Sequence, residues 1–419
     1  MTETLVASRL AKSEAEAIGR LKVIGIGDAG CNIINQMTYK RLTGADFVSI
    51  NMDAQALALS EAPIRILLGE KFTKDLGVGG NLELAFKAAE ESRHAIESAV
   101  IGADVVLIVA GMGGATGTGA TPVVAEVAKE LGCLTIALVT EPFSFEGEER
   151  VEVAKAGIQK LNTRVDTLII IRNDLLLKCC GTTKSVDDAF RAVNEILLRG
   201  VRAIYEATVS IPGLIKLDFA DVRSVLKGAG PARISFGRSS GGNRGANAAK
   251  SALSSPLMDI PLNEARCLLF NITGGSGLTL FECNEAAQVI SRAVAPDAMI
   301  VFGIAFDPEM NSEVDVTIIV AGLGMKRAHE LLGLGGSLGE IIEFQAAKAF
   351  FEANRRRLLD KYEGKYIAIL SREVVDADDD FSLLAERVYS CYGYKDIYMP
   401  KVEKKGTILH IPTPHVEKP

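Results

Sequence analysis

A glycine-rich segment at 111–119, GMGGATGTG, has the composition of a phosphate-binding loop. It holds five glycines and two threonines in nine residues, after the apolar run DVVLIVA and before the helical sequence TPVVAEVAKELG. At such a junction, free main-chain N–H groups and the helix dipole face an anion, and the hydroxyls of Thr116 and Thr118 can donate to phosphate oxygens. No lysine follows, so this is not a Walker A loop. The segment predicts a phosphate site, and its density of glycines disfavours the alternative, a tight turn without a ligand.

A second loop, GIGDAG at 25–30, fits the G-x-G-x-x-G pattern before the helical sequence CNIINQM. This pattern alone is a weak signal, because it opens dinucleotide-binding folds and also occurs as a packing turn. Asp53 follows at about the spacing of a ribose-binding acid. A dinucleotide-dependent oxidoreductase is therefore one interpretation. It is disfavoured because no catalytic lysine or histidine group stands near the loops, the four histidines being at 94, 329, 410 and 415.

The elements that must position these loops follow a regular alternation of short apolar runs and helical patterns. Strands are predicted at 21–27, 46–53, 64–69, 104–111, 134–140 and 165–174, and a long helix at 186–206. This alternation is typical of a doubly wound parallel sheet with helices on both faces. We therefore predict an α/β fold that places the glycine loops at the mouth of one sheet.

The second half of the chain predicts a compact α+β unit and then a small appendix. Strands are expected at 265–275, 298–307 and 314–323 around a helix at 281–294, followed by a charged helix at 337–362. The appendix has candidate strands at 366–376 and 406–414 on either side of a helix near 380–392. The predicted domains are an N-terminal polar extension (1–20), a nucleotide-binding domain with its connecting helix (21–206), the α+β domain (207–325) and the C-terminal helix with its module (326–419).

Composition indicates an ordinary globular protein and excludes several partners. The chain is 48% hydrophobic and 24% charged, with a net charge of −7. This charge gives no electrostatic reason to bind nucleic acid or anionic lipid. Seven cysteines without a CxxC pair predict reduced thiols, and we find no signal core and no membrane-length apolar run. We therefore expect a cytoplasmic protein without direct membrane insertion.

An ordered set of loops resembles the nucleotide site of the FtsZ/tubulin family. The segments GIGDAGCN, SINMDAQAL, DLGVGGN, GMGGATGTG, VTEPFSFEGEER, IIRND and DAFRAVNEIL occur in the family's order. PGLIKLDFADV resembles the loop that completes the neighbouring subunit's active site, and NITGGSGLTLFECNEAAQVI resembles the second domain. The resemblance covers about 21–323 and identifies the chain as a member of this family. It implies a GTPase that binds GTP/GDP with Mg²⁺ and polymerises head to tail with itself.

The resemblance also implies a role for individual residues. The phosphate-binding residues would be Gly27, Asp28, Ala29, Gly30, Asn32, Val78, Gly79, Gly80, Asn81, Gly113, Gly114, Ala115, Thr116, Gly117, Thr118 and Gly119. The ribose would be held by Glu146 and Arg150, and the guanine by Phe190, Asn173 and Asn194. Asp218 and Asp221 would enter the next subunit's site and polarise the attacking water.

The sequence departs from the family pattern at three places, which affects the expected GTPase and polymerisation function. Lys216 replaces the usual Asn of the hydrolytic loop. A lysine there can stabilise transition-state charge or pair with Asp218 and slow the chemistry, so we predict reduced or altered GTP turnover. Asp28 replaces a glycine, and a carboxylate beside phosphates is repulsive unless a metal lies between them.

A non-hydrolysing scaffold that co-assembles with another family member is therefore a second interpretation. The third departure is the folded C-terminal module, which stands where bacterial FtsZ proteins typically have a disordered linker and a short anchor-binding peptide. We therefore expect that peptide to be absent.

Overall fold

We describe the protein from a computed structural model. The structure describes residues 20–39, 44–69, 81–180, 185–208, 219–260, 262, 265–295, 298–307, 309–310, 312–322, 347, 350–351, 354–370, 373–392, 397 and 399–402. Its internal contacts divide the chain into two units, Met1–Gly333 and Leu334–Pro419. Along the described residues, no helix combines the length and the apolar character needed to cross a membrane.

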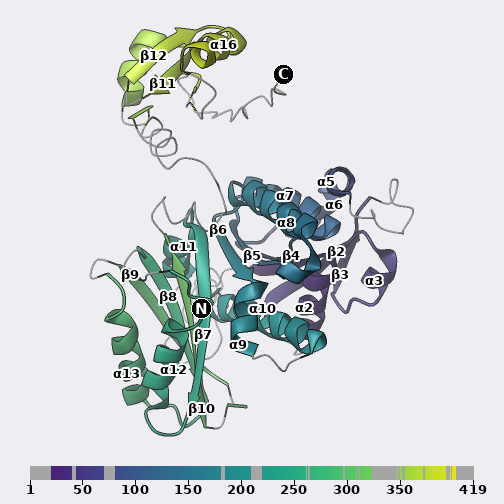
Figure 1. The fold of residues 1–419 in the computed structure, drawn as a ribbon, viewed down its shortest axis with the longest axis vertical. Coiled ribbons are helices and arrows are strands. Elements are labelled where there is room, and N and C mark those ends of the chain that lie inside the picture. Colours follow the sequence, from purple (N-terminus) through teal and green to yellow (C-terminus); the bar gives the residue numbers. More distant parts are fainter. Residues whose placement is uncertain are drawn as a thin grey trace, which may run out of the picture. The chain divides into compact units, whose positions relative to one another are not determined.

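The described part of the first unit is built on one ten-stranded sheet with the order β3-β2-β1-β4-β5-β6-β7-β10-β8-β9 (Figure 1). The first six strands are all parallel and have the strand order of a doubly wound fold. They are β1 (Leu21–Ile26), β2 (Ala45–Asn51), β3 (Ile64–Leu67), β4 (Val105–Gly111), β5 (Leu134–Glu141) and β6 (Thr167–Arg172). The predicted α/β fold class is confirmed.

Helices cover both faces of this parallel sheet, which explains its continuous apolar strands. Every residue from Val105 to Ala110 is fully buried, as expected for a strand covered on both sides. The helices are α2 (Gly27–Tyr39), α3 (Ala54–Ala58), α5 (Leu82–Glu91), α6 (Arg93–Val100), α7 (Ala115–Glu130), the 3₁₀ turn η1 (Ser144–Glu146), α8 (Glu148–Asn162), α9 (Asn173–Cys180) and α10 (Val186–Thr208). Helices α5, α6 and α8 adjoin α7, and α10 adjoins α2 (Figure 1). Each glycine loop thus lies between a strand end and the helix that follows it.

The second half of this unit continues the same sheet through β7. Its elements are α11 (Phe219–Leu226), β7 (Gly230–Ser240), α12 (Arg244–Leu253), β8 (Cys267–Gly274), α13 (Leu280–Ser291), β9 (Met299–Phe306) and β10 (Glu313–Ala321). Strand β7 pairs in parallel with β6 over three residues and antiparallel with β10 over most of its length. The predicted α+β pattern is present, and β7 and α12 are additions that the sequence reading missed. Strand β7 was missed partly because Arg233 interrupts its apolar run. Arg233 is nevertheless only 2% exposed, because Asp259 pairs with it at 2.7 Å.

The second unit contains a two-stranded antiparallel hairpin and a helix. Strands β11 (Tyr366–Leu370) and β12 (Glu373–Asp378) pair, and α16 (Phe381–Tyr392) follows. The prediction of one strand at 366–376 is therefore wrong, because this range contains β11 and the start of β12, which pair antiparallel. Apolar clusters lie on both faces of the hairpin, one with helical Leu358 and the other with Leu384 of α16. The predicted strand at 406–414 lies outside the described residues.

A charged pair joins α12 to the start of α13. Glu282 accepts a hydrogen bond from Arg244 Nε at 2.7 Å and also accepts from the backbone N–H of Thr279, closing a capping box. The Arg244 side chain is 12% exposed and that of Glu282 is 18% exposed. The hydrogen bond from Arg244 lowers the pKa of Glu282 to about 2. The carboxylate form is therefore strongly preferred in the folded chain.

We expect Glu282→Gln to lower the free energy of unfolding at neutral pH by about 1–2 kcal/mol, because it removes one charge from the pair and weakens the cap. The native pKa lies below the ordinary value of 4.5, so this stabilisation is complete above pH 4.5 and is lost as the pH falls towards 2. Urea denaturation at pH 7 and pH 3 should therefore give a smaller difference at pH 3. Glu285→Gln on the same helix is the control, and an equal difference at both pH values would contradict the assignment.

Candidate functional site

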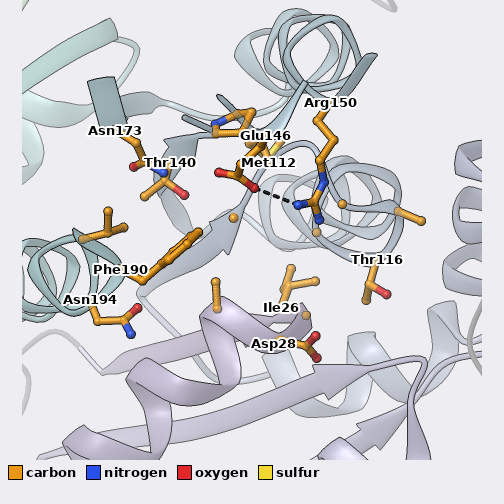
Figure 2. A pocket seen from close by; sticks show the side chains of 18 residues that line it. Ile26, Asp28, Met112, Thr116, Thr140, Glu146, Arg150, Asn173, Phe190 and Asn194 are labelled. Atoms are coloured by element: carbon orange, nitrogen blue, oxygen red, sulfur yellow. Dashed lines mark hydrogen bonds and ion pairs between the residues drawn. The ribbon is translucent and has the colours of Figure 1, made fainter. Parts of the chain in front are cut away.

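A cavity of about 510 Å³ lies at the carboxyl ends of β1, β4, β5 and β6 (Figure 2). This volume is within the range of about 300–1,000 Å³ that is usual for small-molecule sites. The lining residues are Ile26, Gly27, Asp28, Ala29, Gly111, Met112, Gly114, Ala115, Thr116, Gly117, Thr140, Pro142, Glu146, Arg150, Asn173, Phe190, Val193 and Asn194. They come from loops far apart in the sequence, which the parallel sheet brings to one edge.

One end of the cavity is formed by the first turns of α2 and α7. The first N–H groups of a helix have no acceptor within it, and the helix dipole makes this end positive. The N-cap residue of α7 is Gly114, so no N-cap side chain accepts from the first N–H groups of this helix. Gly27 begins α2 with a φ of +69°, a conformation that favours glycine. This end can therefore bind an anion through the main chain.

Close packing behind the loop fixes where these amides lie. A Cβ at Gly117 would stand 2.2 Å from the carbonyl oxygen of Gly111, so only glycine fits there. The hydroxyl of Thr118 accepts a hydrogen bond from the N–H of Gly113 at 2.8 Å and is buried. Thr118 thus holds the loop from within, while Thr116 lines the cavity.

Glu146 and Arg150 form a fixed pair on the cavity wall. Glu146 accepts from Arg150 Nη1 at 2.7 Å and from the N–H of Phe143 at 2.8 Å. Its side chain is only 13% exposed, whereas that of Arg150 is 55% exposed. The pair presents a carboxylate and a guanidinium side by side, as Figure 2 shows.

The other end of the cavity holds an aromatic ring and two carboxamides. Phe190 on α10 is 39% exposed, and its ring meets Phe143 edge-on at 5.4 Å. Asn173 begins α9 and is 4% exposed, and its Oδ1 has no hydrogen-bond partner. Leaving a buried acceptor unpaired costs about 1–3 kcal/mol, so this oxygen is suited to a donor from a bound molecule. Phe190 and Asn194 line the same cavity, and Figure 2 shows Phe190 between the two asparagines.

Twelve of the 24 predicted site residues line this one cavity. They are Gly27, Asp28, Ala29, Gly114, Ala115, Thr116, Gly117, Glu146, Arg150, Asn173, Phe190 and Asn194. Six other predicted residues of the described chain do not line it: Gly30, Asn32, Asn81, Gly113, Thr118 and Gly119. Asn81 instead caps α5 by accepting from the N–H of Leu84, and Gly119 packs against α5.

Several predicted residues are outside the cavity for other reasons. Asp221 is exposed in the first turn of α11. Val78, Gly79, Gly80, Lys216 and Asp218 lie outside the described residues. Asp53, which motivated the dinucleotide interpretation, caps α3 by accepting from the N–H groups of Gln55 and Ala56, and it does not line the cavity.

The cavity also contains residues to which the sequence analysis assigned no individual role, although three of them lie in the predicted loops 25–30 and 111–119. These are Ile26, Gly111, Met112, Thr140, Pro142 and Val193. Four of them lie at or just after the carboxyl ends of β4 and β5, where lining residues are expected in a doubly wound sheet. Their position at a strand end was therefore a usable signal, although their residue types were not.

Comparisons with known proteins agree with this arrangement. A model of the Tubulin/FtsZ family GTPase domain matches residues 20–181, and one of the FtsZ family C-terminal domain matches residues 230–324. Residues 357–405 match a family of unknown function (DUF5678). An empty FtsZ dimer from M. jannaschii is 36% identical, with a TM-score of 0.72, over 75% of this chain and 92% of that one.

Two structures from Haloferax volcanii share the fold at lower identity. The GDP-bound CetZ1 monomer is 23% identical with a TM-score of 0.61, over 75% of this chain and 97% of that one. The GTPγS-bound CetZ2 protofilament is 19% identical with a TM-score of 0.61, over 75% of this chain and 98% of that one. The fold, the two family matches and the M. jannaschii similarity together place the chain in the FtsZ/tubulin family. It carries the GTPase domain of that cytoskeletal family, as predicted.

The packing of the glycine loop can be tested with two alanine variants. Gly117→Ala forces a methyl group against the Gly111 carbonyl and should lower the free energy of unfolding by about 2–3 kcal/mol. Gly114→Ala meets nothing within 4 Å and should cost less than about 1 kcal/mol as a poorer N-cap. Urea denaturation measures both, and equal losses would contradict the described packing.

Proposed function

We propose that this chain binds GTP in the cavity, polymerises head to tail and hydrolyses GTP where two copies meet. The observation that carries the nucleotide assignment is the buried, unpartnered Oδ1 of Asn173 at one end of a cavity whose other end is lined by helix N-termini. Guanine has N–H donors at N1 and N2 of its Watson–Crick edge, whereas adenine has an acceptor at N1 and a donor at N6. A carboxamide oxygen that faces N1 therefore favours guanine over adenine.

The lining residues divide the cavity into three parts that match the parts of a nucleotide. Phe190 would stack on the base, with Asn173 and Asn194 at its polar edge. The Glu146–Arg150 pair would hold the ribose hydroxyls. The first turns of α2 and α7 would bind the phosphates through main-chain amides. The CetZ neighbours, which their titles describe as bound to GDP and GTPγS, support this assignment.

The charges of the lining are compatible with Mg²⁺ on the nucleotide. Asp28 and Glu146 are the acids and Arg150 is the base, so the lining has a formal charge of −1. Arg150 already pairs with Glu146. Within the described residues, no group of three or more His, Cys, Asp or Glu could hold a metal alone. A Mg²⁺ ion would therefore depend on phosphate oxygens, whose charge it would neutralise.

Features of the second half support assembly with another copy. Met299 on the edge strand β9 is 42% exposed and contacts Ser224 of α11 at 3.9 Å. The exposed Asp221 lies in the same helix. A second copy that covers this surface would bury Met299 and reach Asp221, which lies three residues before Ser224 on α11. The relatives described as an FtsZ dimer and a CetZ2 protofilament support such self-association.

We expect Asn173→Ala to weaken GTP binding about tenfold or more and to change ATP binding less, because guanine has adjacent donors at N1 and N2 for the lost oxygen, whereas adenine has an acceptor at N1. Titration with fluorescent GTP and ATP analogues measures both affinities. Asn162→Ala is a matched control, since Asn162 Oδ1 is also buried and unpartnered but does not line the cavity. Equal loss for both nucleotides, or the same loss in the control, would argue against base recognition.

Assembly and hydrolysis are tested together by following light scattering and phosphate release with GTP, GDP or ATP and Mg²⁺. We expect light scattering and phosphate release to rise with GTP and Mg²⁺ but not with GDP or ATP. We expect Lys216→Asn to change the rate of phosphate release, because position 216 belongs to the proposed hydrolytic loop. Lys160→Asn, an exposed lysine of α8, should leave the rate unchanged. Assembly without release would support the alternative function, a non-hydrolysing scaffold that co-assembles with another family member. The absence of both signals would contradict the proposal.

A further inference from the structure

One carboxylate lies at the end of the cavity that is formed by the first turns of α2 and α7, where main-chain N–H groups converge. It belongs to Asp28, the second residue of α2, which is exposed and lines the cavity (Figure 2). The helix N-terminus stabilises this negative charge while no other anion is present. The unpartnered oxygen of Asn173 indicates independently that the same cavity receives a ligand.

A buried asparagine holds the Asp28 carboxylate in place. Asn51 at the end of β2 is 1% exposed, and its Nδ2 donates to Asp28 Oδ1 at 2.9 Å. The carboxamide orientation is fixed, because its Oδ1 accepts from the N–H groups of Met52 at 2.8 Å and Asp53 at 3.3 Å. Among the residues that the structure describes, nothing donates to Asp28 Oδ2. One oxygen is therefore anchored, and the other remains available to a ligand.

The electrostatics of the cavity require a cation when phosphates enter. Asp28 and a phosphate chain would compete for the same helix N-termini and repel each other. Arg150, the one cationic side chain of the described lining, is already paired with Glu146. A divalent cation between the carboxylate and the phosphates removes the repulsion. Mg²⁺ commonly binds through one or two carboxylates together with phosphate oxygens and water.

We infer that Asp28 is a ligand of the divalent cation, binding it directly or through a water molecule, and that it makes nucleotide affinity conditional on that cation. This inference rests on the proposed function, because the phosphates of the guanine nucleotide supply the other oxygens. Asn51 is the positioning residue that orients the carboxylate. Without the cation, Asp28 opposes binding, and with the cation it contributes to binding.

The test compares wild type with Asp28→Asn, which removes the charge with little change of shape. A non-hydrolysable GTP analogue is titrated by calorimetry in excess Mg²⁺ and in EDTA. We expect Asp28→Asn to bind about tenfold more weakly than wild type in Mg²⁺ and about tenfold more tightly in EDTA. This change of sign separates a cation ligand from a residue that only stabilises α2, since a stabilising residue would lower both affinities.

Two further measurements keep the test decisive. Asp28→Gly is a second charge-removing variant, and circular dichroism checks that each variant is folded. Asp46→Asn is the matched control, because Asp46 lies at the amino end of β2 and its side chain is 65% exposed. Electron paramagnetic resonance with Mn²⁺ and the GTP analogue should show about tenfold weaker Mn²⁺ binding to Asp28→Asn than to wild type or to the control.

Each outcome has a definite meaning. Equal effects of Asp28→Asn in Mg²⁺ and EDTA, or no effect in either, would overturn the role of Asp28 and leave nucleotide binding standing. A wild-type chain that binds no guanine nucleotide in either solution would overturn the proposed function and this inference together.

Discussion

The convergence of two helix N-termini at one edge of a parallel sheet is the constraint on which this structure depends. Strands β1 and β4 are neighbours; β1 runs directly into α2, and three residues join β4 to α7. Their unpaired N–H groups therefore point to the same place, which the helix dipoles make positive. Glycine at 117 allows the chain to turn this tightly, since a side chain would meet the Gly111 carbonyl. Such an edge binds anions without a lysine, which explains why the site lacks a Walker A sequence.

Helix α10 connects this edge to the second half of the first unit. Its N-terminal part supplies Phe190 and Asn194 to the cavity. Its C-terminal part makes ion pairs with the second half, Arg199 with Asp315 at 2.5 Å and Arg202 with Asp307 at 2.7 Å. Burial raises the pKa of Glu206, which pairs with Arg202 at 2.6 Å. Removing one partner of such a buried pair is costly, so these ion pairs hold α10 against the second half. A ligand that contacts Phe190 would therefore contact an element that is also held by ion pairs to the second half.

The second unit is stabilised by two apolar clusters of its own. The β11–β12 hairpin has an apolar cluster on each face, covered by helical residues around Leu358 on one side and by α16 on the other. A two-stranded hairpin is marginal alone, and packing against helices supplies the stability that it lacks. The match to M. jannaschii FtsZ covers 75% of the chain, whereas residues 357–405 match a family of unknown function. The FtsZ/tubulin resemblance therefore explains the first unit only.

Sequence alone could predict the elements whose signals are local. The six parallel strands and α10 follow from hydrophobic pattern, and twelve predicted residues meet in one cavity because loop order fixes which strand ends they follow. Features that depend on a distant partner were not predictable. Strand β7 was missed because the buried charge of Arg233 is compensated by Asp259, which lies outside the strand. Residue type alone was also insufficient at Thr118, which has the type of a phosphate ligand, yet its hydroxyl accepts from the N–H of Gly113 within the same loop.

Asp28 shows most clearly why a residue's role could not be predicted from its own segment of sequence. The sequence places an acid in a phosphate loop, which alone could be a defect, a helix-stabilising charge or a metal ligand. The pairing of β1 with β2 brings Asn51 to it, and the backbone N–H groups of Met52 and Asp53 fix the direction of the Asn51 carboxamide. Because a buried amide is used to orient the carboxylate, the geometry favours a specific role in the cavity over a tolerated substitution. The chemistry of this position is therefore determined jointly by two strands, and neither segment reveals it alone.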